Sequence, residues 1–553
     1  MITTAWVDPA LQIRGQDDLA VRAPCENLYS QLLPGITNVT DRARLYAFYP
    51  WLVWATERHQ GPLRQKPFQD ILRRAECLLT LIGAWHTNQT EGLLWEHGGG
   101  LVGRNTLVPV WEQTESGKSI RLSIYATTSE DTGHRYFKNR LGGLGQYYLS
   151  TLRELGILGG DARQGVGYSP ERGELLAVAF DRMVDRKKFF DVLEQDRVQA
   201  DDLKALRRFC PCYLTSSKQE LEALTDLIFN QEGVFGDTPG ENRRKTLGLA
   251  LDLASRLSTM SPGQASDGLT VDTFRACAYA QSLPDGGRWA VPAPLKAIQE
   301  GWQIYQRNEL LSIAVQSIFW AGLDKLQKTG LNPSNSEAYR SWFESSFASS
   351  VASAFGNSFA GALSQTDRRI PPIESWTHPN HEIQLGFKLG DIPHHFDPDD
   401  CHEEVVRAAV GIILTLSVRG RKTEGGYGAY IQSPAYLAPY PINLNSFCVH
   451  ERSTWAAFTT AGLLGWLSTT WGIETHFRVA LRKLRYENRD TFKIRPSEQG
   501  LIVVGAPPPV FSHPRLAQAL QFLWDLGALH LDPETGAFSI TDRGEALKEK
   551  CCG

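Results

Sequence analysis

Residues 152–176 read LRELGILGGDARQGVGYSPERGELL, and residues 523–547 read LWDLGALHLDPETGAFSITDRGEAL. The second stretch aligns with the first without a gap, at a constant offset of 371 positions. The identical pairs are Leu152/Leu523, Leu155/Leu526, Gly156/Gly527, Leu158/Leu529, Asp161/Asp532, Gly165/Gly536, Arg172/Arg543, Gly173/Gly544, Glu174/Glu545 and Leu176/Leu547. A pattern that recurs at this length indicates a structural unit that the chain uses twice.

Each copy predicts a helix, a hairpin and a second helix. Apolar residues at helical spacing end at a C-cap glycine, Gly156 or Gly527, and a short strand follows. A turn at Gly165 or Gly536 leads to a second strand, and Arg-Gly-Glu then starts another helix. This order resembles the recognition helix and wing of the winged-helix superfamily, over roughly 45 residues in each copy.

The layout of the whole chain adds a second resemblance. One such unit in the N-terminal part, one at the C-terminus and helices between them are similar to kleisin-type subunits of SMC complexes. This resemblance implies chromosome maintenance or, in prokaryotes, defence against foreign DNA. It covers the layout alone and does not extend to the first 135 residues.

Composition indicates an ordinary soluble chain of about three domains. Apolar residues make up 42% and charged residues 21% of the 553 positions. The formal net charge of -4 means that any nucleic-acid binding must come from a local basic patch. Nine cysteines, an odd number, and an N-terminus without a signal-peptide pattern favour a reducing cytoplasm.

The pattern of elements predicts a mainly α fold with small β wings or hairpins, in which a helical middle region joins the two winged-helix units. A long buried helix is expected over 294–328. Residues 453–473 carry no charge, but their Thr, Ser and Gly content favours a buried helix over a membrane span. The expected divisions are a helical region with a β-hairpin at 104–127 (1–135), the first unit (136–182), a helical domain (183–365), a His/Pro/Gly-rich irregular segment (366–445), and a helical region with the second unit (446–553).

An aromatic helix follows residue 40, and it permits two interpretations. Its arginines and rings could form a stacking platform for single-stranded nucleic acid. Alternatively, a helix kinked at Pro50 uses the same rings to fill the core. The residues concerned are Arg42, Arg44, Tyr46, Phe48, Tyr49, Trp51 and Trp54.

The strongest basic signal lies just ahead of the second unit. Over 478–495, seven Lys/Arg face only two acidic residues. Four arginines at i, i+4, i+7 and i+11 predict one basic helix face, beside an apolar stripe of Phe477, Leu481 and Leu484. Such a face fits a row of phosphates or an acidic partner, and the alternative is a solvated surface. The candidate nucleic-acid-binding residues are Arg478, Arg482, Lys483, Arg485, Arg489, Lys493 and Arg495, with Lys138, Arg140, Arg153 and Arg163 around the first unit.

Two groups of residues raise the question of a metal. Five of the thirteen histidines lie within 25 residues among carboxylates, as expected for a zinc or iron hydrolase, or else for a solvated loop. These are His378, His381, His394, His395 and His402. The pair Cys210 and Cys212 has metal-like spacing, but no nearby Cys or His completes four ligands, so zinc is not expected there.

Together these features predict a non-enzymatic DNA-associated or complex-assembling subunit without a cofactor. The expected partners are DNA and other protein subunits, and no membrane. The rival prediction is a metal-dependent hydrolase or nuclease centred on 378–404, which would use a divalent metal.

Overall fold

The structure is a computed structural model that describes residues 17–37, 39, 42–89, 97, 99–113, 118–129, 133–160, 165–260, 268–397, 400–421 and 442–552. The described chain is mainly helical, with three separate two-stranded antiparallel hairpins. This confirms the prediction of a mainly α protein with small β-hairpins. Arg163 lies outside the described residues.

The elements are bounded as follows. The α-helices are α1 (Ala23–Leu32), α2 (Leu45–Gln60), α3 (Gln65–Gln89), α5 (Arg104–Gln113), α6 (Leu122–Ala126), α7 (Leu149–Glu154), α8 (Gly173–Asp181), α9 (Arg186–Gln195), α10 (Ala200–Ala205), α11 (Lys218–Ile228), α12 (Thr238–Ser258), α13 (Val271–Ala280), α14 (Lys296–Thr329), α15 (Ser336–Phe355), α16 (Phe359–Arg369), α17 (Glu382–Leu389), α18 (Ile392–His395), α19 (His402–Arg421), α22 (Leu444–Ser453), α23 (Thr460–Trp466), α24 (Glu474–Glu487), α25 (Leu516–Asp525) and α26 (Asp542–Cys552). The strands are β1 (Leu158–Gly159), β2 (Gly167–Tyr168), β3 (Ile494–Ser497), β4 (Gly500–Val503), β5 (Leu529–Leu531) and β6 (Phe538–Ile540). Short 3-10 helices are η2 (Arg207–Phe209), η3 (Pro211–Ser216), η4 (Ala293–Leu295) and η5 (Trp455–Ala457), and π-helices are η1 (Leu144–Tyr148) and η6 (Leu467–Ile473).

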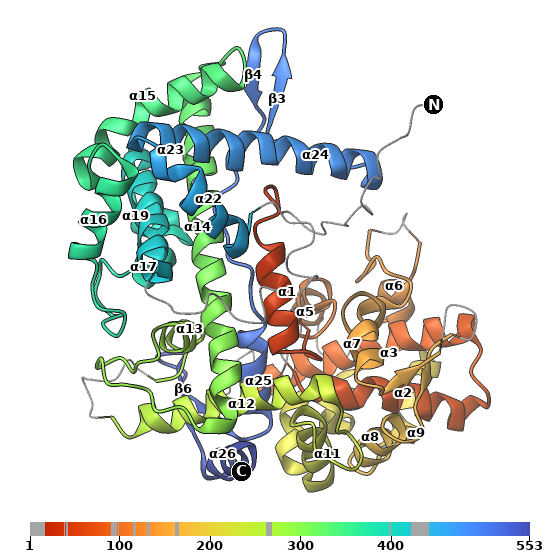
Figure 1. The fold of residues 1–553 in the computed structure, drawn as a ribbon. Helices are drawn as coiled ribbons and strands as arrows, with labels where there is room; N and C mark the ends of the chain where they lie inside the picture. Colours follow the sequence, from red (N-terminus) through yellow and green to blue (C-terminus); the bar gives the residue numbers. More distant parts are fainter. Residues whose placement is uncertain are drawn as a thin grey trace, which may run out of the picture.

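Helix α14 runs through the middle of the molecule (Figure 1). Its side chains are buried around most of its circumference, because α1, α12, α13, α17, α19 and η6 all pack against it. It ends where Gly330 adopts a left-handed conformation with φ of 67°. The expectation of a long buried helix over 294–328 is therefore confirmed.

Helix α2 packs against α8 in the N-terminal part of the fold, and it decides between the two interpretations of the aromatic helix. Pro50 lies inside α2, and the rings of Tyr46, Tyr49 and Trp51 are fully buried. The Arg44 guanidinium is buried too, and it pairs with both oxygens of the Glu220 carboxylate, at 2.7 and 2.9 Å. The core interpretation is confirmed, and these rings are not a surface for nucleic acid.

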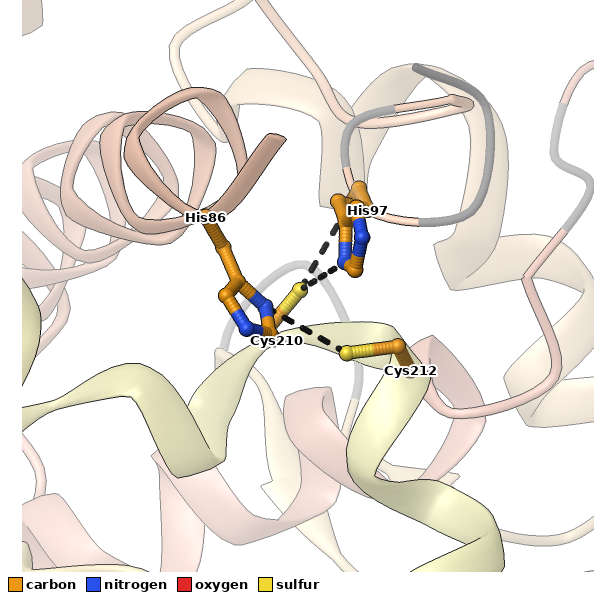
Figure 2. A group of neighbouring side chains, drawn as sticks. All are labelled: His86, His97, Cys210 and Cys212. Atoms are coloured by element: carbon orange, nitrogen blue, oxygen red, sulfur yellow. Dashed lines mark hydrogen bonds between the residues drawn. The ribbon is translucent and has the colours of Figure 1, made fainter. Parts of the chain in front are cut away.

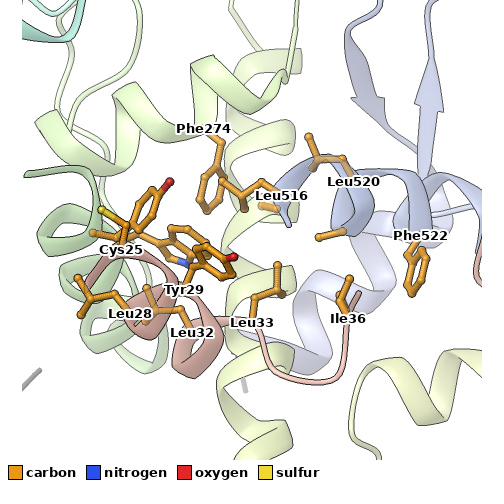
Figure 3. Packing of buried hydrophobic residues seen from close by; sticks show 14 of the residues in the cluster. Cys25, Leu28, Tyr29, Leu32, Leu33, Ile36, Phe274, Leu516, Leu520 and Phe522 are labelled. Carbon is orange, nitrogen blue, oxygen red and sulfur yellow. The ribbon is translucent and has the colours of Figure 1, made fainter. Parts of the chain in front are cut away.

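The two ends of the chain meet in one core. Helix α1 contributes Leu28, Tyr29 and Leu32 to a cluster that also contains Leu516 and Leu520 of α25 (Figure 3). A buried ion pair adds to this junction, because the Arg42 guanidinium contacts the Asp525 carboxylate at 3.1 Å. Burial of these groups ties the second repeated unit to the start of the described chain.

The two repeated stretches form the same order of elements, α7–β1–β2–α8 and α25–β5–β6–α26. Gly156 and Gly527 both adopt left-handed φ values, 66° and 70°, at the end of the first helix. Gly173 and Gly544 both lie where an added Cβ would meet a backbone carbonyl oxygen, at 2.3 and 2.1 Å. The repeat therefore has a structural cause, since its shared glycines allow left-handed helix ends and close backbone approaches.

The two hairpins differ in register and in surroundings. Leu158 pairs with Tyr168, whereas Leu529 pairs with Ile540, one residue later than the constant offset places it. Strand β6 packs on α12, and Phe538 forms a bridge with Leu269. The second hairpin is thus covered along one edge by the rest of the fold.

Two sequence-based expectations are wrong. Residues 104–113 and 122–126 form α5 and α6, so the β-hairpin predicted at 104–127 does not exist. The segment 366–445 is not irregular in its described part, because α17, α18 and the 20-residue α19 lie within it. Apolar residues at alternating positions, Val108 and Val110, then Leu122 and Ile124, suggested strands in the first case. In the second, Pro and His suggested loops, although α19 packs against α14.

The charge-free stretch 453–473 is divided among the end of α22, η5, α23 and η6. Trp455, Trp466 and Trp471 form mutual edge-to-face contacts there, with ring centroids 5.2 to 5.5 Å apart. No helix in the described part of the chain has the length and apolarity that crossing a membrane requires.

Candidate metal centre and basic surfaces

Four side chains from distant parts of the sequence meet in the N-terminal half of the fold. His86, His97, Cys210 and Cys212 each place one potential ligand atom within 4.8 Å of all the others. The Cys212 Sγ lies 3.4 Å from Nδ1 of His86, and the Cys210 Sγ lies 3.6 Å from Nδ1 of His97. Figure 2 shows the two imidazoles and the two sulfur atoms pointing toward one another.

Local structure positions His86 and the two cysteines. His86 lies in the last turn of α3. Its imidazole ring stacks on the Tyr213 ring, with the ring centroids 5.5 Å apart. Cys210 is extended, and Pro211 then opens the 3-10 helix η3, which turns the chain so that both sulfur atoms face the same point. The Arg44 guanidinium donates to the carbonyl of Cys210 at 2.6 Å and holds this turn in place.

The four side chains are largely shielded from solvent. His86, His97 and Cys210 are buried, and Cys212 is half-buried. Burial raises the pKa of the Cys210 thiol, but hydrogen bonding from Cys212 and the charges of Arg42 and Arg44 outweigh it, so this pKa lies below its usual value. The hydrogen bond with Cys210 and burial raise the pKa of Cys212 to about 11. Of the two thiols, Cys210 is therefore the more readily deprotonated.

Two thiols and two imidazoles are a donor set typical of a structural zinc site. Among the residues that the structure describes, this is the only group of three or more His, Cys, Asp or Glu side chains arranged to hold a metal ion. The expectation that no histidine or cysteine complements Cys210 and Cys212 is wrong, because the fold supplies His86 and His97. The tight Cys-Pro-Cys spacing was the signal in the sequence, but it did not identify the histidines.

The five histidines of the 378–402 segment do not converge. His381 is buried and lies 3.4 Å from the Glu382 carboxylate, and burial lowers its pKa to about 4. His402 pairs instead with Asp324 of α14, at 2.7 Å. His394 is exposed and pairs with Asp391, while His378 and His395 are also exposed. Among the described residues, these five histidines therefore form no common metal site.

Helix α24 carries three of the four arginines of the predicted basic face. Its inward side holds His476, Val479 and Lys483, and the buried Lys483 amine donates to the Asp17 carbonyl at 2.9 Å. Of the predicted apolar stripe, Leu481 is 57% and Leu484 42% exposed, whereas Phe477 is half-buried and packs against the core.

The outward side of α24 also carries arginines. Arg478 and Arg485 are exposed, and Arg482 is half-buried. In the described structure none of these three guanidinium groups has a carboxylate partner, and Arg485 lies over the Tyr486 ring at 5.4 Å. Leu481, Leu484 and Tyr486 lie among these charges, so this face combines positive charge with apolar area.

The other basic candidates are dispersed. Arg489 follows the end of α24, which closes at the left-handed Asn488, so the predicted row of four on one helix contains three. Arg495 on β3 pairs with Asp490 at 3.0 Å. Lys493 precedes β3 and is half-buried. Lys138, Arg140 and Arg153 are exposed around η1 and α7, at the first repeated unit.

A second basic surface was not expected from the sequence. A cleft of about 780 Å³ opens where α8, α9 and η2 meet. Its lining carries six Lys/Arg and two Asp, namely Arg58, Arg182, Arg186, Lys187, Arg207, Arg208, Asp181 and Asp185. Lys187, Arg207 and Arg208 are exposed and have no ion-pair partner among the described residues. The basic runs 186–188 and 207–208 were the available signal.

Comparison of the chain with protein-family models, with curated proteins and with solved structures found no match in any of the three.

Proposed function

We propose that this protein is a non-enzymatic DNA-associated subunit of a larger assembly, and that the outward face of α24 contacts the phosphate backbone. The observation that carries the proposal is the arginine face itself. Arg478, Arg482 and Arg485 lie on the solvent side of one helix, and the described structure offers them no carboxylate partner. Guanidinium groups that lack a carboxylate partner and lie on a rigid element are suited to bind phosphate oxygens.

The geometry of α24 is compatible with a DNA backbone. At 1.5 Å rise per residue, Arg478 and Arg485 are separated by about 10 Å along the helix. Phosphates of one strand advance about 3.4 Å each along the duplex axis, so three flexible arginines can reach about three of them. Such contacts give affinity without reading the base sequence.

The inner side of α24 supports this orientation. The buried Lys483 amine bonds to the Asp17 carbonyl, and the His476 ring accepts the backbone N–H of Lys493 at 2.8 Å. These polar contacts fix the rotation of the helix about its axis. The arginines therefore point outward without depending on a bound partner.

The same face also supports a second candidate function, the assembly of a protein complex. Leu481 and Leu484 are among the most exposed large apolar side chains of the described chain, and Tyr486 is 53% exposed. Apolar area mixed with arginines is typical of a protein interface more than of a pure phosphate contact. An acidic protein segment with apolar anchors would match both features.

The layout resemblance to kleisin-type subunits extends the proposal to a biological setting. Two winged-helix units joined by helices would place the protein in chromosome maintenance or in defence against foreign DNA. In the second unit, β6 is paired with Leu269 and packs on α12, so the hairpin there acts as a packing element in this proposal. DNA contact is assigned to the basic surfaces and not to that hairpin.

A salt series tests the proposal. The affinity for duplex DNA is measured by fluorescence anisotropy at several salt concentrations for the wild type and R478Q/R482Q/R485Q. Each neutralised phosphate adds about 0.9 to the slope of log K against log salt, so the slope should flatten by about 2.7. The loss should be equal for unrelated DNA sequences.

Two further variants locate the contact. R368Q/R369Q/R407Q removes three exposed charges from α16 and α19, and it should leave the slope unchanged. K187Q/R207Q/R208Q removes three unpaired charges from the cleft. If only the cleft variant flattens the slope, DNA binds there and α24 is left for a protein partner. Absence of DNA binding by the folded wild type contradicts the proposal.

A further inference from the structure

We propose that His86, His97, Cys210 and Cys212 bind a structural Zn²⁺ ion with closed tetrahedral coordination. The inference is independent of the proposed DNA association. It depends on three observations, which are the separations of the ligand atoms, the chemistry of the donors and the burial of the group.

The observed separations match the edges of a zinc tetrahedron. With Zn–S of about 2.3 Å and Zn–N of about 2.0 Å, a sulfur and a nitrogen on one tetrahedron lie about 3.5 Å apart. The two measured sulfur–nitrogen distances are 3.4 Å for Cys212 with His86 and 3.6 Å for Cys210 with His97. All remaining ligand pairs lie within 4.8 Å, so small side-chain rotations bring four atoms onto one ion.

The donor set favours zinc over calcium and magnesium. Thiolate and imidazole ligands suit zinc, whereas calcium and magnesium require oxygen ligands, and the group contains no carboxylate. Four protein ligands leave no open position for water, which is the pattern of structural and not of catalytic zinc.

The charges of the proposed zinc site also balance. Two thiolates neutralise Zn²⁺, so the complete site carries no net charge inside the protein. The nearby Arg42 and Arg44 are each neutralised by their own carboxylates, Asp525 and Glu220. A buried metal centre therefore adds no uncompensated charge to this part of the core.

The site would join three segments of chain. It connects the last turn of α3 through His86, the residue His97, and the turn at 210–212. Arg207, Arg208 and Phe209 precede Cys210 directly and line the basic cleft. Zinc at this point would hold the two cysteine side chains and the end of α3 next to that wall of the cleft.

Metal analysis of the full-length protein, purified without a histidine tag, tests the proposal. The wild type should contain about one zinc per chain. The variant C210S/C212S should lose it, and C448S/C552S, which removes two other half-buried thiols, should retain it. Replacement of zinc by Co²⁺ should give the visible bands of a tetrahedral cobalt–thiolate site in the wild type and in C448S/C552S only.

A second pair of variants separates ligation from folding. H86A removes a ligand and should lose zinc, whereas H86C supplies a different zinc ligand at the same position and should retain it. Removal of zinc from the wild type with a chelator should lower its melting temperature, and Zn²⁺ but not Mg²⁺ should restore it.

Three results would overturn the inference. The first is a folded wild type that contains no zinc and shows no cobalt bands when Co²⁺ is added. The second is a disulfide between Cys210 and Cys212 in protein purified under reducing conditions, detected as two missing free thiols after denaturation. The third is full retention of zinc by C210S/C212S.

Discussion

His476 provides the sharpest test of how α24 is held. Its side chain is fully buried, its Nδ1–H donates to the Asp18 carbonyl at 3.1 Å, and its Nε2 accepts the N–H of Lys493 at 2.8 Å. This arrangement requires a neutral ring, because a protonated Nε2 has no lone pair to accept a hydrogen bond. Burial lowers the pKa of His476 from 6.5 to about 4.

The sign and size of the effect follow from linkage. Above pH 6.5 the ring is neutral in both the folded and the unfolded chain, so it contributes no pH dependence. Between pH 6.5 and about 4 the unfolded chain binds a proton that the folded chain does not, and the free energy of unfolding falls. The loss attributable to His476 is about 2 kcal/mol at pH 5 and approaches about 3 kcal/mol below pH 4.

The assay is urea unfolding followed by tryptophan fluorescence, at pH 7.5 and at pH 5, for the wild type and H476Q. The variant is less stable at pH 7.5, because it loses the fitted ring. Its disadvantage should shrink by about 2 kcal/mol at pH 5, since only the wild type has this histidine to titrate. H395Q, which replaces an exposed histidine, should follow the wild type. A stability difference between wild type and H476Q that is equal at both pH values would refute the reasoning.

Three further predictions concern the core. Arg42→Met and Asp525→Asn should each lower the free energy of unfolding by about 3 kcal/mol, because each leaves its buried partner without an ion pair. In urea unfolding, the double variant should be less destabilised than the sum of the two single variants, by at least about 1 kcal/mol. Gly544→Ala places a Cβ 2.1 Å from the Ala528 carbonyl oxygen and should cost about 1–3 kcal/mol, measured as a fall in melting temperature. The buried Glu76 carboxylate accepts hydrogen bonds from two backbone N–H groups and two tyrosine hydroxyls. Because a glutamine side chain cannot accept all four, Glu76→Gln should lower the free energy of unfolding in urea by at least about 2 kcal/mol.

The repeated stretch shows what a sequence can specify by itself. Gly156 and Gly527 end helices in both copies, and Gly173 and Gly544 allow the next helix to approach the preceding carbonyl. These requirements are local, so the order helix, hairpin, helix was predictable. The burial of the second hairpin was not, because it depends on Leu269 and α12, which are distant in sequence.

Helix α24 shows where periodicity fails. Phe477, Leu481 and Leu484 form an apolar stripe in the sequence, yet Leu481 and Leu484 face solvent. The helix is oriented by polar anchors, since His476 and Lys483 both find buried partners near residues 17 and 18. A pattern of apolar residues does not reveal such long-range hydrogen bonds. The outward leucines are then available for a partner, which is why α24 supports both candidate functions.

The candidate metal centre was missed for a related reason. Cys210 is separated from His97 by 113 positions, so no local spacing reports their contact. The turn that brings them together is anchored a second time, because the Arg44 guanidinium donates to the carbonyls of Arg208 and Cys210 at 2.6 Å while it pairs with Glu220. Loss of zinc alone should therefore loosen the cysteine side chains and leave the backbone at Arg208 in place. A zinc-free wild type should then retain the cleft-dependent part of any DNA binding, whereas Arg44→Met should reduce it even with zinc bound. The opposite result would mean that the metal, and not the Arg44–Glu220 pair, positions this wall of the cleft.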